Sequence, residues 1–339
     1  MKKLIPMVVL SLVSQTTFAN REFLGSISPS SQTSTVSTNT NTQVEVTSVP
    51  RPEEFDVQFK ESDLTEKSWM KEFPYVVVVT KTEKGVKIPE TVRIYKDGKI
   101  VTFEEIKAEL QIVQKNEQLE LNDLINQYNE SNSRYQKDAL KTEIELMQKR
   151  IADRPMLLKQ LVSVDEKGNT RYIRENGVFK VSTGRDQFEE KGEHHSNHDS
   201  WSVTPSGYFT PKSFNKKHRS ESYSPSMCKN WFGKAFGIEC TYMENAIFFN
   251  GPIALHRAIP GTELELGRKA SGGCVRLPGA IADFLYSSIV KTKLEFGRYP
   301  VVAKDGSLID PSTIVNKRPL DAYGALIIVQ NIKATAVQQ

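Results

Sequence analysis

The spacing of apolar positions predicts two kinds of structure in different parts of the chain. Apolar runs typical of β-strands occupy residues 75–80, 91–95, 100–103, 178–182, 208–210, 246–249, 253–255, 301–303 and 325–329. Two of the connections, Asp97-Gly98 and Asn250-Gly251, are sequences that favour tight β-hairpin turns. We therefore expect a mostly β (α+β) fold.

A different pattern covers residues 103–153, which contain no glycine or proline. Apolar residues recur there at helical spacing: Ile106, Leu110 and Val113; Leu121, Leu124 and Tyr128; Leu140, Ile144, Met147 and Ile151. A polar break at residues 129–133 predicts a helical hairpin, inserted at residues 104–157. Its two apolar faces can pack against each other, so we expect a semi-independent unit. It is either a decorative insertion or a lid or docking element.

The N-terminal residues have the pattern of a secretory signal peptide over residues 1–19. Lys2 and Lys3 precede a short apolar run, and small residues come before a cleavage point after Ala19. The following residues are rich in Ser, Thr, Asn and Gln, which predicts a disordered linker over residues 20–68. No later segment is apolar for long enough to predict a stable membrane span.

Charge and cysteine content narrow the classes of function. The net charge of +4 falls to +2 (43 basic minus 41 acidic residues) once Lys2 and Lys3 are removed, which argues against nucleic acid as a partner. The chain has three cysteines, and thiols of exported proteins tend to pair. Cys228 and Cys240 lie close in sequence, so we expect a disulfide between them and a free thiol at Cys274.

Cys274 is a candidate nucleophile, and His256 upstream is its candidate base. Arg276 shares the extended face of Cys274, where its positive charge favours the thiolate. Gly272 and Gly273 permit close approach of a substrate carbonyl, and their N–H groups, with that of Cys274, can bind the developing oxyanion. On residue types alone, a buried structural cysteine beside a glycine turn is the alternative.

This segment resembles the signature of the L,D-transpeptidase (YkuD-like) family, a histidine followed by Ser/Thr-His-Gly-Cys-Val/Ile-Arg/Asn. The matching positions are His256, Ser271, Gly273, Cys274, Val275 and Arg276. Val181-Ser182-Thr183-Gly184 and Thr204-Pro205-Ser206-Gly207 are similar to the family's glycine strand and its Thr-Pro turn. Two positions depart from the pattern. Gly272 stands where the family usually has a second histidine, and Arg257 where many members have glycine.

The resemblance implies a β-rich catalytic domain in two parts, residues 69–103 and 158–305. A short helix beginning near Pro278 would follow the nucleophile, and residues 306–339 would form a C-terminal extension with a late strand. Cys274 would attack the bond between an L-centre and D-alanine in a peptidoglycan stem peptide, with His256 as base. Arg276, Ser271 and Arg257 would bind the substrate. The implied location is the periplasm or cell wall, without metal or cofactor.

The sequence does not distinguish between three possible acyl acceptors. A stem amine would make the enzyme a transpeptidase, water an L,D-carboxypeptidase, and a protein amine an anchor for wall-attached proteins. A non-catalytic wall-binding scaffold with an inert Cys274 is the rival from another class. A papain-like hydrolase is disfavoured because its cysteine precedes its histidine in the chain.

Other polar clusters suggest no cofactor. His194, His195 and His198 occur in a polar segment where a solvated loop is favoured over a zinc site. His218 lies among basic residues on an expected surface, and Trp201 is assigned to core packing rather than to a cleft.

Overall fold

A computed structural model describes residues 49–83, 86–230, 235–295, 297–314 and 321–333. The expected signal peptide and the first part of the expected linker, to residue 48, lie outside the described residues. The largest sheet has the strand order β4-β5-β2-β1-β19-β9, with β3 paired to β2. Its strands are β1 (Tyr75–Thr82), β2 (Thr91–Lys96), β3 (Lys99–Ile100), β4 (Ile173–Glu175), β5 (Val178–Lys180), β9 (Gly207–Phe209) and β19 (Ala325–Ile332).

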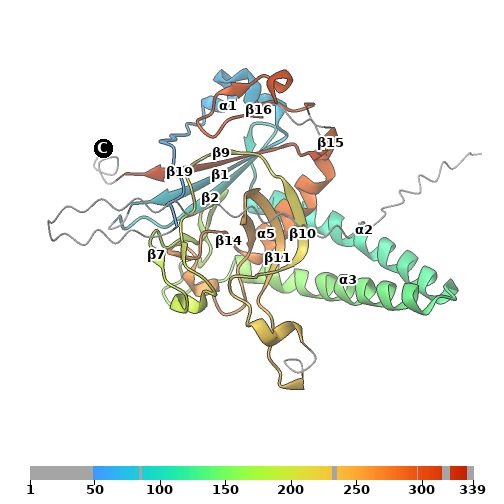
Figure 1. The fold of residues 1–339 in the computed structure, drawn as a ribbon. Coiled ribbons are helices and arrows are strands. Elements are labelled where there is room, and N and C mark those ends of the chain that lie inside the picture. Colours follow the sequence, from blue (N-terminus) through green and yellow to red (C-terminus); the bar gives the residue numbers. More distant parts are fainter. Residues whose placement is uncertain (1–48, 84–85, 231–234, 296, 315–320, 334–339) are drawn as a thin grey trace, which may run out of the picture. The chain divides into compact units, whose positions relative to one another are not determined.

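Strands β1 and β19 form the centre of this sheet and pair in parallel over their whole length, from Tyr75–Ala325 to Thr82–Ile332 (Figure 1). Alternate residues of both strands enter different apolar clusters, as the period of two in a strand requires. Val77 and Ile327 belong to the main core, whereas Val76 and Ile328 face a second cluster. The sheet is therefore buried on both faces, which suits continuous apolar runs.

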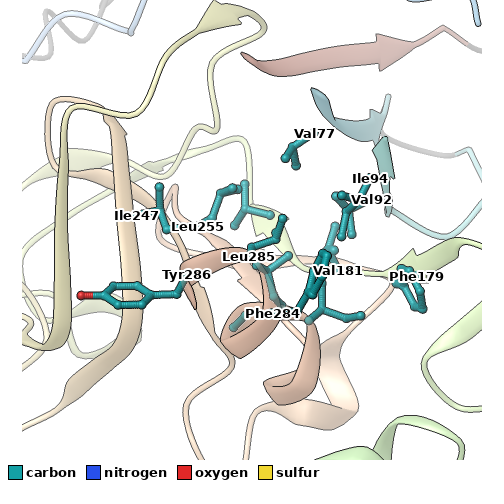
Figure 2. Packing of buried hydrophobic residues seen from close by; sticks show 14 of the residues in the cluster. Val77, Val92, Ile94, Phe179, Val181, Ile247, Leu255, Phe284, Leu285 and Tyr286 are labelled. Carbon is teal, nitrogen blue, oxygen red and sulfur yellow. The ribbon is translucent and has the colours of Figure 1, made fainter. Parts of the chain in front are cut away.

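The main core lies between the large sheet and a second sheet that carries the short helix α5. This sheet has the order β10-β11-β12-β14, and its strands are β10 (Ser213–Arg219), β11 (Tyr242–Asn250), β12 (Ile253–Arg257) and β14 (Val275–Leu277). Helix α5 (Gly279–Ile289) begins directly after Pro278. Figure 2 shows Phe284 and Leu285 of this helix among core residues of both sheets. The mostly β (α+β) class is confirmed.

The N-terminal segment before β1 covers the other face of the large sheet. Val57, Phe59 and Leu64 are buried there, Leu64 within the short helix α1 (Asp63–Glu66). The backbone N–H of Phe59 donates to Gln330 Oε1 at 2.8 Å. The prediction of a disordered linker through residue 68 is therefore wrong for these residues, because a few well-spaced apolar side chains suffice to cover the sheet.

The helical hairpin is present, with α2 at Phe103–Glu130 and α3 at Arg134–Leu161. Helix α2 begins where a strand was predicted, because Thr102 and Glu105 form a capping box. The two helices lie side by side (Figure 1), and their outer halves share a small cluster of their own: Leu121, Leu124, Leu140 and Met147. The inner ends behave differently, since Ile106, Leu110, Leu157 and Leu161 belong to the main core. The expectation of a semi-independent unit thus fails at the base of the hairpin.

A buried arginine fastens the base of the hairpin to helix α5. Arg154 is fully buried, its Nε donates to Asp283 Oδ2 at 2.8 Å, and its Nη2 lies 2.8 Å from Glu117 Oε2. These contacts join α2, α3 and α5. Helix α3 continues through Pro155 to Leu161, beyond the expected end of the insertion at residue 157. Burial of Leu157 and Leu161 favours that continuation.

The late strand expected within residues 306–339 is present as β19, but it is a central strand of the large sheet and not part of an extension. The remaining strands form two-stranded pairs: β6 (Thr183–Gly184) with β13 (Lys269–Ser271), β7 (Phe188–Glu189) with β8 (Ser200–Trp201), β15 (Leu294–Glu295) with β18 (Asp321–Ala322), and β16 (Val301–Val302) with β17 (Leu308–Ile309). None of the helices in the described part of the chain combines the length and apolar character needed to cross a membrane.

Candidate active site

A cleft of about 670 Å³ contains both residues of the predicted catalytic pair. Cys274 and His256 line it together with Arg276, from the edge of the second sheet formed by β12 and β14. These strands are parallel neighbours in which His256 lies opposite Arg276. The register brings the end of β12 beside the residue that precedes β14, so two positions 18 residues apart in sequence share one cleft.

Cys274 occupies a tight turn between β13 and β14 and is partly exposed. Its Sγ lies 3.7 Å from the carbonyl oxygen of Pro252 and 4.0 Å from Met243 Sδ. Gly273 precedes it with a φ of 119°, a left-handed conformation that disfavours any other residue. A Cβ at this position would also lie 3.0 Å from the carbonyl oxygen of Val203. Glycine at 273 is therefore a requirement of the turn.

The hydroxyl of Ser271 holds the turn closed. Ser271 Oγ accepts from the Gly273 N–H at 3.1 Å and donates to the carbonyl oxygen of Cys274. The Gly273 N–H is consequently engaged, so its predicted role as an oxyanion donor is not supported. Ser271 is almost completely buried where it lines the cleft, and its hydroxyl makes both of these contacts within the turn. Its role in binding substrate stays a prediction.

Thr204 fixes the orientation of the peptide that joins Gly273 to Cys274. Its Oγ1 donates to the Gly273 carbonyl oxygen at 2.6 Å and accepts from the Gly184 N–H at 2.9 Å. In a planar trans peptide the next N–H points opposite to the carbonyl, so the Cys274 N–H faces away from Thr204. Among the described residues, neither the Cys274 nor the Gly272 N–H has a hydrogen-bond partner. These two N–H groups are therefore the candidates for binding an oxyanion.

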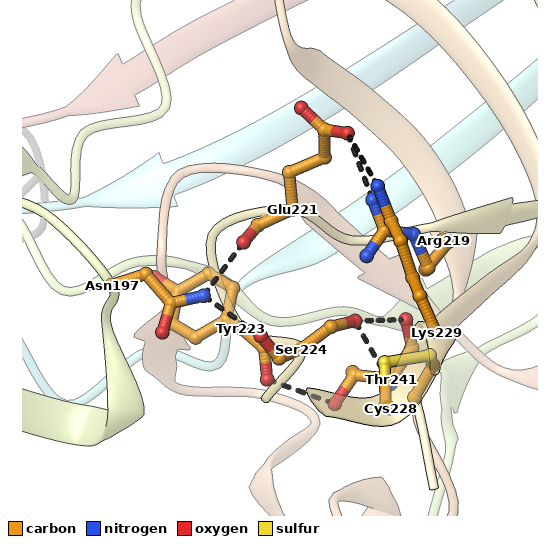
Figure 3. The surroundings of a disulfide bond; sticks show 9 residues. Asn197, Arg219, Glu221, Tyr223, Ser224, Cys228, Lys229 and Thr241 are labelled. Atoms are coloured by element: carbon orange, nitrogen blue, oxygen red, sulfur yellow. Dashed lines mark hydrogen bonds and ion pairs between the residues drawn. A yellow bond between two sulfur atoms is a disulfide. The ribbon is translucent and has the colours of Figure 1, made fainter. Parts of the chain in front are cut away.

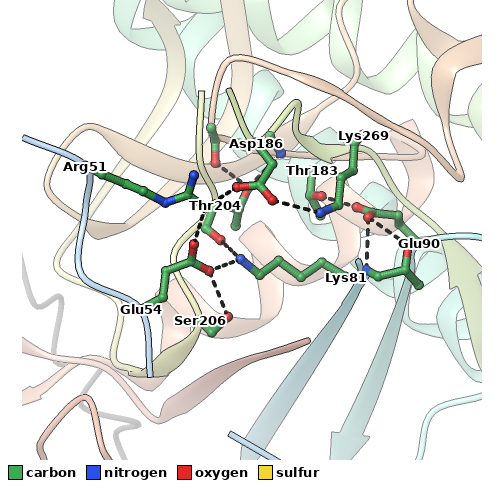
Figure 4. A network of polar contacts seen from close by, with 12 residues as sticks. Arg51, Glu54, Lys81, Glu90, Thr183, Asp186, Thr204, Ser206 and Lys269 are labelled. Carbon is green, nitrogen blue, oxygen red and sulfur yellow. Dashed lines mark hydrogen bonds and ion pairs between the residues drawn. The ribbon is translucent and has the colours of Figure 1, made fainter. Parts of the chain in front are cut away.

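A largely buried network of hydrogen bonds and ion pairs holds the backbone of Thr204 (Figure 4). Lys81 Nζ donates to the carbonyl oxygen of Thr204 at 2.7 Å and pairs with Glu54, which also accepts from Ser206 Oγ at 3.2 Å. Burial lowers the pKa of Lys81. Since Lys81 lies on β1, the network connects the turn that contains Cys274 to the centre of the large sheet.

His256 is buried and oriented by a backbone carbonyl. Its Nδ1 lies 2.7 Å from the carbonyl oxygen of Arg257. A carbonyl oxygen can only accept, so Nδ1 carries the proton, and in the neutral ring Nε2 is then the unprotonated nitrogen. This tautomer leaves a lone pair that can take a proton from a thiol.

Burial shifts the two members of the pair toward their uncharged forms. It lowers the pKa of His256 to about 4, with a further lowering by the positive charges of Arg276 and His218. Burial raises the pKa of the Cys274 thiol, against an opposing effect of a backbone hydrogen bond and of Arg276. Both directions favour a thiol and a neutral imidazole as the forms present at neutral pH.

The two arginines predicted to bind substrate lie in different environments. Arg276 lines the cleft and pairs with Glu265. Arg257 points to the other face of β12, where its Nη1 pairs with Glu244 at 2.6 Å in a separate groove beside α3. Arg257 therefore does not line the cleft of Cys274, because neighbouring residues of a strand face opposite sides. Its role in binding substrate stays a prediction.

The structure joins Cys228 and Cys240 in a disulfide, the pairing expected from the sequence. Figure 3 shows it beside the loop that carries Tyr223 and Ser224. This loop forms a wall of the cleft that sequence reasoning missed, since Tyr223 has no motif around it. Trp201 and His218 also line the cleft instead of the core or an open surface.

The described residues contain no group of His, Cys, Asp or Glu suited to hold a metal ion. His194 is exposed, and its Nε2 lies 3.4 Å from Gln187 Nε2, whereas His198 lines the cleft.

Residues 159–302 match the model of the YkuD family, described as the L,D-transpeptidase catalytic domain. The resemblance found in the sequence is thereby confirmed over this part of the chain, which includes His256 and Cys274. Strands β1, β2 and β19 and most of the helical hairpin lie outside the matched residues. No curated protein matches the chain. The match indicates an activity of the L,D-transpeptidase family on peptidoglycan.

Proposed function

We propose that this chain, with an L,D-transpeptidase catalytic domain over residues 159–302, forms a thioester at Cys274 with a peptidoglycan stem peptide and transfers the acyl group to an amine. The observation that carries the proposal is the presence of Cys274 and His256 in one cleft, with the His256 tautomer set by the Arg257 carbonyl. The N–H groups of Gly272 and Cys274, which have no hydrogen-bond partner in the described part of the chain, would bind the oxyanion.

In the first half-reaction, Cys274 Sγ attacks the carbonyl carbon between the L-centre and D-alanine, while His256 Nε2 takes the thiol proton. The C–N bond then breaks, and His256 returns that proton to the amine of the departing D-alanine. In the second half-reaction, the amine of another stem attacks the thioester and passes a proton through His256 to the Cys274 sulfur. The thiol is regenerated, and one amide has replaced another.

We further propose that the protein acts in the periplasm or cell wall. The disulfide between Cys228 and Cys240 supports an oxidising compartment, as does the signal-peptide pattern of the first residues. Water as acceptor would give L,D-carboxypeptidase products, and a protein amine would give wall-anchored proteins.

Incubation of the purified protein with tetrapeptide muropeptides, followed by mass spectrometry of products and enzyme, tests the proposal. We expect cross-linked dimers that have lost one D-alanine, the one that leaves the acyl donor, and a carbapenem adduct on Cys274. Cys274→Ala should abolish both, and His256→Gln should slow turnover by roughly a hundredfold to ten-thousandfold. The matched control is His194→Gln, because His194 is exposed outside the cleft. A wild-type protein with inert Cys274 would instead identify a wall-binding scaffold.

A further inference from the structure

The cleft wall next to Gly272 is formed by the side chain of Tyr223. An ideal Cβ built on Gly272 would lie 1.7 Å from Tyr223 Oη and 2.6 Å from its Cζ, closer than real atoms approach. The φ of Gly272 lies outside the left-handed region, so the backbone does not require glycine here. The reason for glycine at 272 is therefore the phenol group, which fills the volume that a side chain would take.

Tyr223 is held in this place by its own loop. Its backbone N–H donates to Ser220 Oγ at 3.2 Å, and its carbonyl oxygen accepts from Thr241 Oγ1 at 3.1 Å. Asn197 Nδ2 donates to the next carbonyl, that of Ser224, at 2.8 Å (Figure 3). Cys240 of the disulfide directly precedes Thr241 in the chain. A backbone held in this way presents the Tyr223 side chain to the cleft from a fixed position.

The hydroxyl of Tyr223 is available as a hydrogen-bond donor. The guanidinium of Arg185 interacts with it electrostatically, and a guanidinium carries hydrogen-bond donors only. Arg185 therefore cannot take the hydroxyl proton, and its own hydrogen bonds go to Glu189, Ser202 and the carbonyl oxygen of Ala270. Burial raises the pKa of Tyr223, so that proton stays in place at neutral pH.

We propose that Tyr223 is a specificity-determining residue, whose hydroxyl donates a hydrogen bond to an amide or carboxylate oxygen of the stem peptide bound at Cys274. It replaces the side chain that residue 272 lacks. The inference rests on the proposed function, since it assigns a contact to the acyl donor of that reaction. The side chains at positions 272 and 223 then exclude each other sterically, so that a polar side chain fits at one position only when the other position lacks it.

The first experiment removes the hydroxyl and keeps the ring. Tyr223→Phe and the control Tyr242→Phe are compared for kcat/KM of acylation by a stem tetrapeptide, normalised to the rate of Cys274 alkylation by iodoacetamide. Tyr242 lines the separate groove beside α3, outside the catalytic cleft. We expect a loss of roughly three- to fifteenfold for Tyr223→Phe, as for one neutral hydrogen bond, and no loss for the control.

The second experiment exchanges the two side chains. Gly272→His alone should lose most activity, because the imidazole would overlap sterically with the Tyr223 ring. Adding Tyr223→Gly to Gly272→His should recover activity relative to the single variant, although each single substitution is harmful.

The outcomes separate this inference from the proposed function. If the wild-type protein turns over the tetrapeptide but Tyr223→Phe matches Tyr242→Phe, the inference is overturned and the function stands. Full activity of Gly272→His with Tyr223 intact also overturns it. If the wild-type protein does not acylate, the proposed function itself fails, and the inference with it.

Discussion

At Cys274 and His256, burial acts on both members of the pair in favour of their neutral forms. The pKa of the thiol is raised, and that of the imidazole is lowered to about 4. We predict that the alkylation rate of Cys274 by iodoacetamide rises about tenfold per pH unit through the neutral range, because only the thiolate reacts. Mass spectrometry between pH 5 and 9 measures this, with Cys274→Ala as background. A rate independent of pH from 5 to 8 would indicate a preformed thiolate–imidazolium pair and contradict the prediction.

The same shift at His256 links stability to pH. Between about pH 4 and 6.5 the unfolded chain binds a proton at His256 and the folded protein does not. The free energy of unfolding therefore rises with pH across that window. The stability that neutral His256 contributes is lost as the pH falls from about 6.5 to about 4. Urea unfolding at pH 4.5 and 7 should show a smaller pH effect for His256→Gln than for the wild type.

At the scale of elements, the base of the helical hairpin depends on one buried cation. We predict that Arg154→Met lowers the free energy of unfolding by about 3–5 kcal/mol, because Asp283 would be left as a buried carboxylate without its partner and Glu117 would keep only Arg150. The matched control is Arg134→Met at the exposed start of α3, with an expected change within about 0.5 kcal/mol. Equal effects of the two substitutions in urea unfolding would show that Arg154 does not join the hairpin to α5.

Elements with local signals could be predicted from the sequence, and elements with distant partners could not. The dipeptides Asp97-Gly98 and Asn250-Gly251 predict their turns, and the helical spacing of apolar residues within 103–153 predicts the helical hairpin. Arg154 gives no such signal, because its partners come from α2 and α5. The same holds at the site. Cys274 and His256 carry a local motif, but Tyr223 reaches Gly272 from a loop about 50 residues away, and only three-dimensional structure joins them.

For the whole molecule, strand β19 decides whether the catalytic domain can form. Leu326, Ile327, Ile328 and Val329 are fully buried. At about 1.5–3 kcal/mol each, their burial contributes roughly 6–12 kcal/mol, comparable with the entire stability of a typical domain. We predict that a chain ended after residue 314, which keeps all of the matched residues 159–302, does not fold. A chain ended after residue 333 should unfold cooperatively, as the full chain does; circular dichroism and urea unfolding compare the two. A folded, reactive 314-residue chain would refute the prediction.

The site shares that dependence, because β19 pairs with both β1 and β9. Lys81 belongs to β1, and Thr204 precedes β9 by three residues. Their hydrogen bond therefore spans two strands that β19 holds together.

The pairing of β1 with β19 also has a consequence in time. Tyr75 and Ala325 are 250 positions apart (325 minus 75), and a ribosome adds about 5–20 residues per second. The edge of β1 that receives β19 thus stays vacant for roughly 12–50 s while the chain is being made. Throughout that interval the nascent polypeptide lacks β19, and a chain that stalls before Ala325 cannot complete the large sheet. Completion of synthesis is in this way a precondition for an assembled cysteine site.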